Sequence, residues 1–222
     1  CENGERSFTF VRKPGADILL AENDVRDEDL RQAKLLNAGS VSMSEEPARG
    51  ATLYAMRRAR EMGKLVCFDV NYRDMIWRGN REEAVRCIRQ ALGYVDLLKM
   101  SDEEVELLCG NRNPSSLLEE FAIHAIVVTH GADGAHCYMK DGVCQASGKP
   151  KHAVDTTGAG DAFWGNVLGS LLRDGIECAD QIELTHMAEA LRWGNSAGGY
   201  CVEHMGAIPG MPTWDDLRAA LA

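Results

Sequence analysis

The sequence predicts an α/β protein with a mostly parallel central sheet. Three observations support this fold class: apolar, strand-like runs alternate with helix-like segments from about residue 35 onward, an Asp141-Gly142 turn joins two further strand-like runs, and two longer helical segments follow. With 222 residues, the chain is long enough to bury one sizeable core. No internal repeat and no long linker marks a second complete domain.

The expected elements can be placed in order along the chain. Phe8, Phe10 and Arg12 alternate with more polar neighbours, which predicts an opening strand. Four apolar runs are then expected as strands, at residues 36–41, 65–69, 95–99 and 125–129. The segments between these strands are expected to contain helices, at residues 46–62, 81–92, 102–109 and 114–122. Because Asp-Gly favours a tight turn, a hairpin is expected next, with strands at 135–139 and 143–146. Two longer helices are expected after it, at 160–173 and 185–199.

Composition excludes several classes of function. The formal net charge of −10 argues against nucleic acid as the main partner, since such binding depends on basic patches. The apolar runs are far shorter than the ~20 residues of a membrane-spanning helix, and the first residues lack an apolar signal-peptide core, so a cytoplasmic protein without a membrane partner is expected. The eight cysteines are scattered singly and without a C-x-x-C pair, which favours reduced core thiols over a disulfide or metal framework.

The stretch 154–163, V-D-T-T-G-A-G-D-A-F, leads from an extended segment into a helix. Its glycines allow a phosphate to approach the backbone, and the first N–H groups of a helix have no partner within the helix. Asp161 in the first turn can face the same phosphate and accept a proton from an attacking hydroxyl. In the alternative interpretation, Asp155 or Asp161 only caps the helix and the glycines only form a turn.

The motif D-T-T-G-A-G-D-A-F closely resembles the second signature of the ribokinase, or PfkB, family of carbohydrate kinases. The resemblance implies a ribokinase-like three-layer α/β sandwich with part of a small β lid. Residues 1–34 would form a partial lid strand and its connection, and residues 35–222 a nucleotide- and sugar-binding domain. In that family the last Asp is the catalytic base and the preceding amides form the anion hole; the matching positions are Asp161 and Gly158, Ala159 and Gly160.

Further matches occur in family order and concern the nucleotide. Residues 127–135 are similar to the family's V-T-x-G-x-x-G strand and turn, which makes Thr129, Gly131 and Gly134 candidate ATP contacts. Asn195 lies where the family has its adenine-side helix. An ordinary turn and an ordinary helix-surface asparagine are the alternatives.

Two candidate ion sites also follow from the resemblance. Ser101-x-x-Glu104 falls where the family has an N-x-x-E motif linked to magnesium and phosphate, so Glu104 is a candidate Mg²⁺ ligand, direct or through water. The same residues form a complete capping box, which requires no ligand. Asp155 and Thr157 match the family's monovalent-cation loop, so the resemblance makes them candidate K⁺ ligands.

The acceptor side is also suggested by similarity. Residues 68–73, F-D-V-N-Y-R, resemble a segment of fructokinases and 2-keto-3-deoxygluconate kinases, which makes Asn71 and Arg73 candidate sugar ligands. Residues 5–12 resemble the lid strand, with Phe10 and Arg12 toward the sugar. That strand is equally a candidate homodimer interface.

The resemblance thus implies a kinase that uses ATP with Mg²⁺ to phosphorylate a sugar, in first place fructose. A 2-keto-3-deoxygluconate kinase is the alternative acceptor assignment, and a non-catalytic relative is an alternative of a different class. Family members normally begin with a further α/β segment that carries a Gly-Gly sugar-binding signature and an early Asp. Neither is present, so we expect a truncated gene, a fragment or an incomplete record. For the chain as written we expect at most weak nucleotide binding and little sugar kinase activity.

Overall fold

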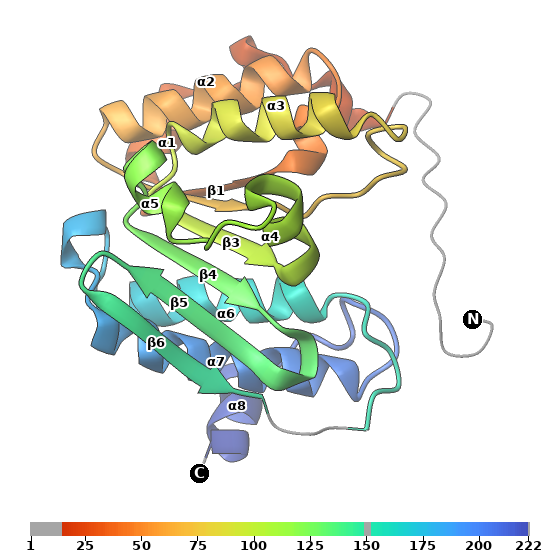
Figure 1. Ribbon diagram of the computed structural model, residues 1–222, viewed down its shortest axis with the longest axis vertical. Helices are drawn as coiled ribbons and strands as arrows, with labels where there is room; N and C mark the ends of the chain where they lie inside the picture. The colour runs from red at the N-terminus through yellow and green to blue at the C-terminus, as the bar shows by residue number, and fades with distance from the viewer. Residues whose placement is uncertain (1–14, 149–151, 222) are drawn as a thin grey trace.

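The computed structural model describes residues 15–148 and 152–221. One six-stranded sheet, in the order β1-β2-β3-β4-β5-β6, forms the middle layer (Figure 1). The first four strands pair in parallel, and the last two form an antiparallel hairpin beside β4. The strands are β1 (Leu35–Gly39), β2 (Leu65–Asp69), β3 (Leu97–Ser101), β4 (Ala125–Thr129), β5 (Gly134–Met139) and β6 (Gly142–Ser147).

The helices lie on both faces of the sheet, so the molecule has three layers (Figure 1). Helices α2 to α5 cover one face, and α6 and α7 cover the other. The helices are α1 (Asp27–Gln32), α2 (Ala48–Glu61), α3 (Arg81–Leu92), α4 (Asp102–Cys109), α5 (Ser116–Phe121), α6 (Ala159–Arg173), α7 (Leu184–Val202) and α8 (Trp214–Leu221). Short 3₁₀ turns occur at Ala16–Leu19, Glu22–Asp24, Ser40–Met43, Gly131–Asp133 and Ala179–Gln181.

This architecture confirms the predicted fold class. The strands predicted at 65–69 and 125–129 and the helices predicted at 81–92 and 102–109 have the predicted bounds. The short helices α1 and α8 were not expected from the sequence. The lid strand expected within residues 1–14 lies outside the described residues; the described part of the predicted connection is helical.

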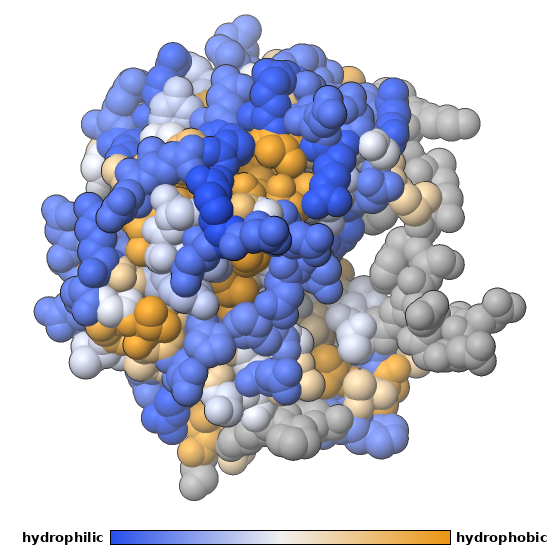
Figure 2. Space-filling model, viewed as in Figure 1, coloured by the Kyte–Doolittle hydropathy of each residue, from blue (hydrophilic) through white to orange (hydrophobic). Residues whose placement is uncertain are grey.

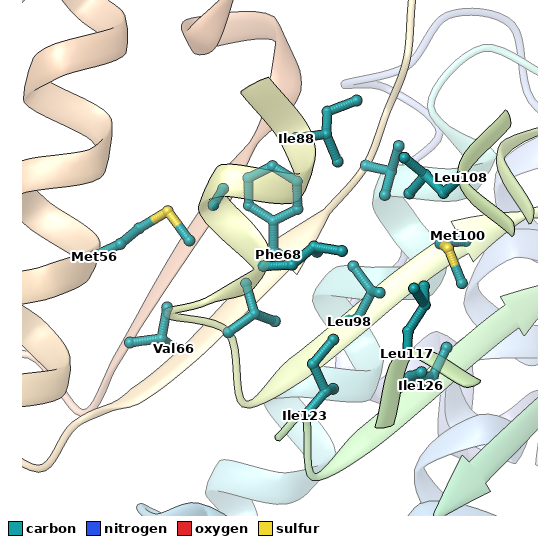
Figure 3. Packing of buried hydrophobic residues seen from close by; sticks show 14 of the residues in the cluster. Met56, Val66, Phe68, Ile88, Leu98, Met100, Leu108, Leu117, Ile123 and Ile126 are labelled. Atoms are coloured by element: carbon teal, nitrogen blue, oxygen red, sulfur yellow. The ribbon is translucent and has the colours of Figure 1, made fainter. Parts of the chain in front are cut away.

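Alternate side chains of each parallel strand enter different cores. Val66, Phe68, Leu98, Met100 and Ile126 pack against α2 to α5, as the close view in Figure 3 shows. The intervening residues of the same strands pack against α6 and α7. Strands buried on both faces therefore appear in the sequence as continuous apolar runs.

Four buried cysteines contribute to these two cores, namely Cys67, Cys87, Cys109 and Cys137, and Cys201 is buried in a smaller cluster beside them. On the outside, Figure 2 shows mostly hydrophilic side chains, with apolar ones visible between them. In the part of the chain that the structure describes, no helix is both long and apolar enough to span a membrane.

Candidate active site

The carboxyl ends of β1 to β4 lie at one edge of the sheet, where open α/β sheets bind their ligands. Two cavities lie at this edge. The nucleotide-side cavity, of about 300 Å³, is lined mainly by the β4–β5 turn and helices α6 and α7. The acceptor-side cavity, of about 630 Å³, is lined by the ends of β2 and β3, the loop after β2 and the start of α6. Both cavities share Thr129, Thr156 and Gly160.

The start of α6 separates these two cavities. Its N-cap residue is Gly158, with a φ of 84° and no side-chain capping hydrogen bond. A Cβ at this position would lie 2.7 Å from the Cβ of Ala207, so only glycine fits. The N–H of Ala159 donates to the carbonyl of Thr156 at 3.2 Å, whereas the next two N–H groups have no acceptor within the helix. The predicted anion cradle therefore has a physical basis in the backbone.

Asp161 is exposed and lines the acceptor-side cavity in the first turn of α6. A general base must be accessible to the hydroxyl whose proton it takes. The position at the junction of the two cavities fits the role predicted for Asp161.

The four candidate ATP contacts lie around one cavity. The nucleotide-side cavity is lined by all four, namely Thr129, Gly131, Gly134 and Asn195. Gly134 has a φ of 107°, and a Cβ there would lie 2.2 Å from the carbonyl oxygen of Ala146. Asn195 donates its Nδ2–H to the same carbonyl at 2.7 Å, which holds α7 against the hairpin.

The candidate sugar ligands Asn71 and Arg73 line the acceptor-side cavity. Asn71 has a positive φ of 42°, and its carbonyl accepts a hydrogen bond from Ser40 Oγ at 3.4 Å. Arg73 is exposed and donates to the carbonyl of Tyr72 at 2.8 Å. Phe10 and Arg12, the other predicted sugar ligands, and the dimer interface proposed for their strand lie outside the described residues.

Glu104 is buried at the start of α4, and both of its carboxylate oxygens accept backbone hydrogen bonds. Oε2 accepts from the N–H of Ser101 at 2.8 Å, which completes the predicted capping box. Oε1 accepts from the N–H of Tyr72 at 2.7 Å and so ties the loop after β2 to α4. Within residues 15–148 and 152–221, no group of three His, Cys, Asp or Glu side chains is arranged to hold a metal ion.

Asp155 is buried and joins two loops. Its Oδ1 accepts from the N–H of Thr157 at 2.8 Å, and its Oδ2 accepts from the N–H of Gly206 at 2.8 Å. Thr157 lines the acceptor-side cavity, and its carbonyl accepts from Cys201 Sγ at 3.5 Å. These contacts explain why the loop before α6 holds its shape.

One charged pair in the acceptor-side cavity was missed in the sequence. Lys99 Nζ lies 3.0 Å from both carboxylate oxygens of Asp69, and the two side chains are 8% and 9% exposed. Burial raises the pKa of the Asp69 carboxyl to about 6; the Lys99 ammonium opposes this rise, and the carboxylates of Glu104 and Asp161 add to it. A lysine and an aspartate within otherwise apolar strands were the available signal.

Comparison with known proteins shows which family the chain belongs to. A sequence profile described as pfkB family carbohydrate kinase matches residues 1–214. The chain is 37% identical over 221 residues to the probable fructokinase-5 of Arabidopsis thaliana, covering 98% of this chain and 67% of that protein. Across three plant fructokinases, it spans 63% to 67% of their length.

Two solved structures are also similar. The fructokinase of Vibrio cholerae O395, in a form with bound fructose, ADP and calcium ion, superposes with a TM-score of 0.85 at 32% identity, covering 100% of this chain and 70% of that one. The aminoimidazole riboside kinase of Salmonella enterica, complexed with aminoimidazole riboside and an ATP analogue, superposes with a TM-score of 0.83 at 31% identity, covering 97% and 71%.

Proposed function

Because the chain belongs to the pfkB family of carbohydrate kinases, we propose that its site transfers the γ-phosphoryl group of ATP to a hydroxyl group of fructose. One observation carries the proposal: two cavities share Thr129, Thr156 and Gly160 at the start of α6, with Asp161 beside the junction. Phosphoryl transfer needs donor and acceptor to meet at one point, because positioning and electrostatics supply most of the catalysis.

The base and ribose of the nucleotide would occupy the first cavity. Its glycines at 131, 134, 198 and 199 leave room for a flat ring against the backbone, and Thr129 and Asn195 offer polar groups. The phosphate chain would then run toward the N-terminus of α6, where the N–H groups of Gly160 and Asp161 and the helix dipole favour negative charge.

The chemical step uses Asp161 as general base. Its carboxylate accepts the proton of the sugar hydroxyl while the hydroxyl oxygen bonds to the γ-phosphorus and the bond from that phosphorus to the bridging oxygen of ADP breaks. The N–H groups at the start of α6 stabilise the charge on the equatorial phosphoryl oxygens. Asn71 and Arg73 would hold the acceptor from the other side of the cavity.

Mg²⁺ fits this site as an ion that arrives with the nucleotide. Such ions are usually held by one or two carboxylates, waters and substrate phosphates. Glu104 would contact the ion through water, since each oxygen already accepts one backbone N–H and retains a lone pair. When bound, Mg²⁺ would neutralise part of the phosphate charge. We propose the loop of Asp155 and Thr157 for K⁺.

Fructose is favoured as acceptor over 2-keto-3-deoxygluconate because the plant and bacterial relatives at 32% to 37% identity are described as fructokinases. A non-catalytic relative is disfavoured because Asp161 is accessible beside an anion cradle. The similarity to the riboside kinase makes ribosides a relevant control acceptor.

An acceptor panel tests the proposal. ADP release with ATP and Mg²⁺ is measured for fructose, ribose, 2-keto-3-deoxygluconate and aminoimidazole riboside, and we expect the highest kcat/KM with fructose. A higher value with another acceptor would replace the assigned sugar. Because little activity is expected from the chain as written, the panel is also run on a version extended to the length of the relatives. Nucleotide binding without turnover on any acceptor by that version would support the non-catalytic alternative.

A further inference from the structure

Lys99 is placed where an apolar residue would be expected. It lies on β3 between Leu98 and Met100, both fully buried, and is itself only 6% exposed. Lysine is rarely buried to this extent unless it is paired, because removing an ammonium group from water is costly. A buried ion pair is also weak as a source of stability, since well-packed apolar residues of similar volume often serve as well or better. The position of this pair therefore calls for a functional explanation.

Strand register decides which way Lys99 faces. Asp69 and Lys99 are directly paired positions of the parallel strands β2 and β3, and both continue the series of side chains that faces α6. A Cβ placed on Gly160 would lie 3.6 Å from Lys99 Nζ. The ammonium group thus lies directly against the first turn of α6, beneath the anion cradle.

The charges around the acceptor-side cavity would otherwise oppose a phosphate. Asp69, Glu104 and Asp161 line this cavity, and the basic residues among its described lining are Lys99 and the exposed Arg73. The Glu104 and Asp161 carboxylates are close enough to affect the titration of Asp69. A polyphosphate entering among three carboxylates needs a cation held on the protein side as well as the cation that it brings.

Building on the proposed kinase activity, we propose that Lys99 is a catalytic residue that donates a hydrogen bond to an oxygen of the γ-phosphoryl group, with Asp69 as its positioning residue. An ammonium group has three N–H donors, and the two contacts of 3.0 Å with Asp69 occupy two of them. The third is available for a phosphoryl oxygen at the start of α6. Asp69 fixes the direction of the lysine side chain before the nucleotide binds.

Nucleotide binding tests this role without requiring an acceptor. Affinities of the chain for Mg²⁺ with ADP and for Mg²⁺ with a non-hydrolysable ATP analogue are measured by titration calorimetry. In Lys99→Met, we expect the analogue to bind about 10- to 100-fold more weakly, as for loss of a hydrogen bond to a charged group, and ADP to bind nearly as before. Lys140→Met, on the exposed hairpin turn, is the matched control and should bind both nucleotides like the parent chain.

Two more variants separate this role from a purely structural ion pair. Asp69→Asn keeps the lysine but holds it less firmly, so it should weaken binding of the analogue by less than Lys99→Met does and leave ADP binding nearly as before. Asp69→Asn/Lys99→Met removes both charges and should bind the analogue as weakly as Lys99→Met. The double variant also avoids a buried unpaired carboxylate, so it guards against loss of folding in Lys99→Met.

The outcomes separate the two proposals. Equal loss of ADP and analogue affinity in both single variants, with recovery in the double variant, would show that the pair only supports the fold and would overturn the role of Lys99. Unchanged analogue affinity in Lys99→Met would overturn it as well. Absence of nucleotide binding by the parent chain would instead refute the proposed kinase function, on which the inference rests.

Discussion

Helices α4 and α6 both begin at the carboxyl edge of the sheet, but their N-termini are closed in different ways. At α4, Ser101 and Glu104 satisfy each other's backbone N–H groups in a capping box. At α6, the N-cap is Gly158, which has no side chain to offer. Helix α4 uses its own side chains to satisfy the N–H groups of Ser101 and Glu104. Helix α6 has no side chain at its N-cap and leaves N–H groups beside two cavities. The residue at the cap thus separates a structural helix start from one that can bind an anion.

The largest expected effect is in the first turn of α6. Asp161→Asn should lower kcat by about 10²- to 10⁴-fold, the usual contribution of a general base, and leave the Kd of ATP within a few-fold of its original value. Steady-state kinetics and calorimetry measure the two quantities. Glu106→Gln, at an exposed carboxylate on α4, is the matched control; an equal loss there would remove the distinction between the helices.

A side chain at the N-cap of α6 should damage both fold and binding. Gly158→Ala adds a Cβ 2.7 Å from that of Ala207 and places alanine at a φ of 84°. Gly175→Ala, at a φ of 80° with nothing within 4 Å of the added Cβ, has the backbone penalty of about 1–2 kcal/mol alone.

Urea unfolding should therefore show a larger loss of stability for Gly158→Ala than for Gly175→Ala, and only Gly158→Ala should weaken ATP binding. Equal effects of the two substitutions on both quantities would mean that close packing at the cradle is unimportant.

Asp69, which lies on β2 beside the start of α6, should give the stability of the protein a pH dependence. The pKa of Asp69 is about 6 in the folded protein, compared with 3.8 for the unperturbed group, so the folded state binds this proton more tightly than the unfolded state. The contribution of this group to the free energy of unfolding is full below pH 3.8 and is lost as the pH rises through about 6.

Asp69→Asn removes this contribution. The unfolding free energy of the parent chain minus that of the variant should therefore decrease from pH 4 to pH 7. Urea denaturation across that range measures the shift, and effects common to both proteins cancel. A difference that does not vary with pH would mean that Asp69 has an ordinary pKa.

The smallest effects are expected at α4, where the contacts are structural. Ser101→Ala should lower the free energy of unfolding by about 1 kcal/mol through loss of the cap. Glu104→Gln should cost about 1–3 kcal/mol, because an amide cannot accept from both Ser101 and Tyr72 with two oxygens.

Only Glu104→Gln should also raise the KM of the acceptor, since Tyr72 follows Asn71 in the loop that lines the cavity. Thermal unfolding and steady-state kinetics of the two variants measure these effects. A raised KM in Ser101→Ala would show that the cap itself supports the site.

The sequence alone was sufficient for features that depend on neighbouring residues. The helix at 102–109 has its capping box within four residues, and the strand at 65–69 is a continuous apolar run, so both were predicted with their bounds. The cradle at 158–161 was likewise recognisable, because glycines and an acidic residue at the start of a helix are adjacent in the chain.

Only the tertiary structure decided which distant residues meet. Asp69 and Lys99 pair because β2 and β3 are adjacent in one register, Tyr72 is tied to Glu104 across 32 positions, and Asp155 accepts from Gly206 across 51. Periodicity indicates that a strand exists, but it does not specify its neighbour or its register, which arise from the packing of the whole sheet between its two helical layers. For that reason the sequence was enough to predict a phosphate cradle at residues 158–161, whereas the charged residue beside it became visible only in the folded molecule.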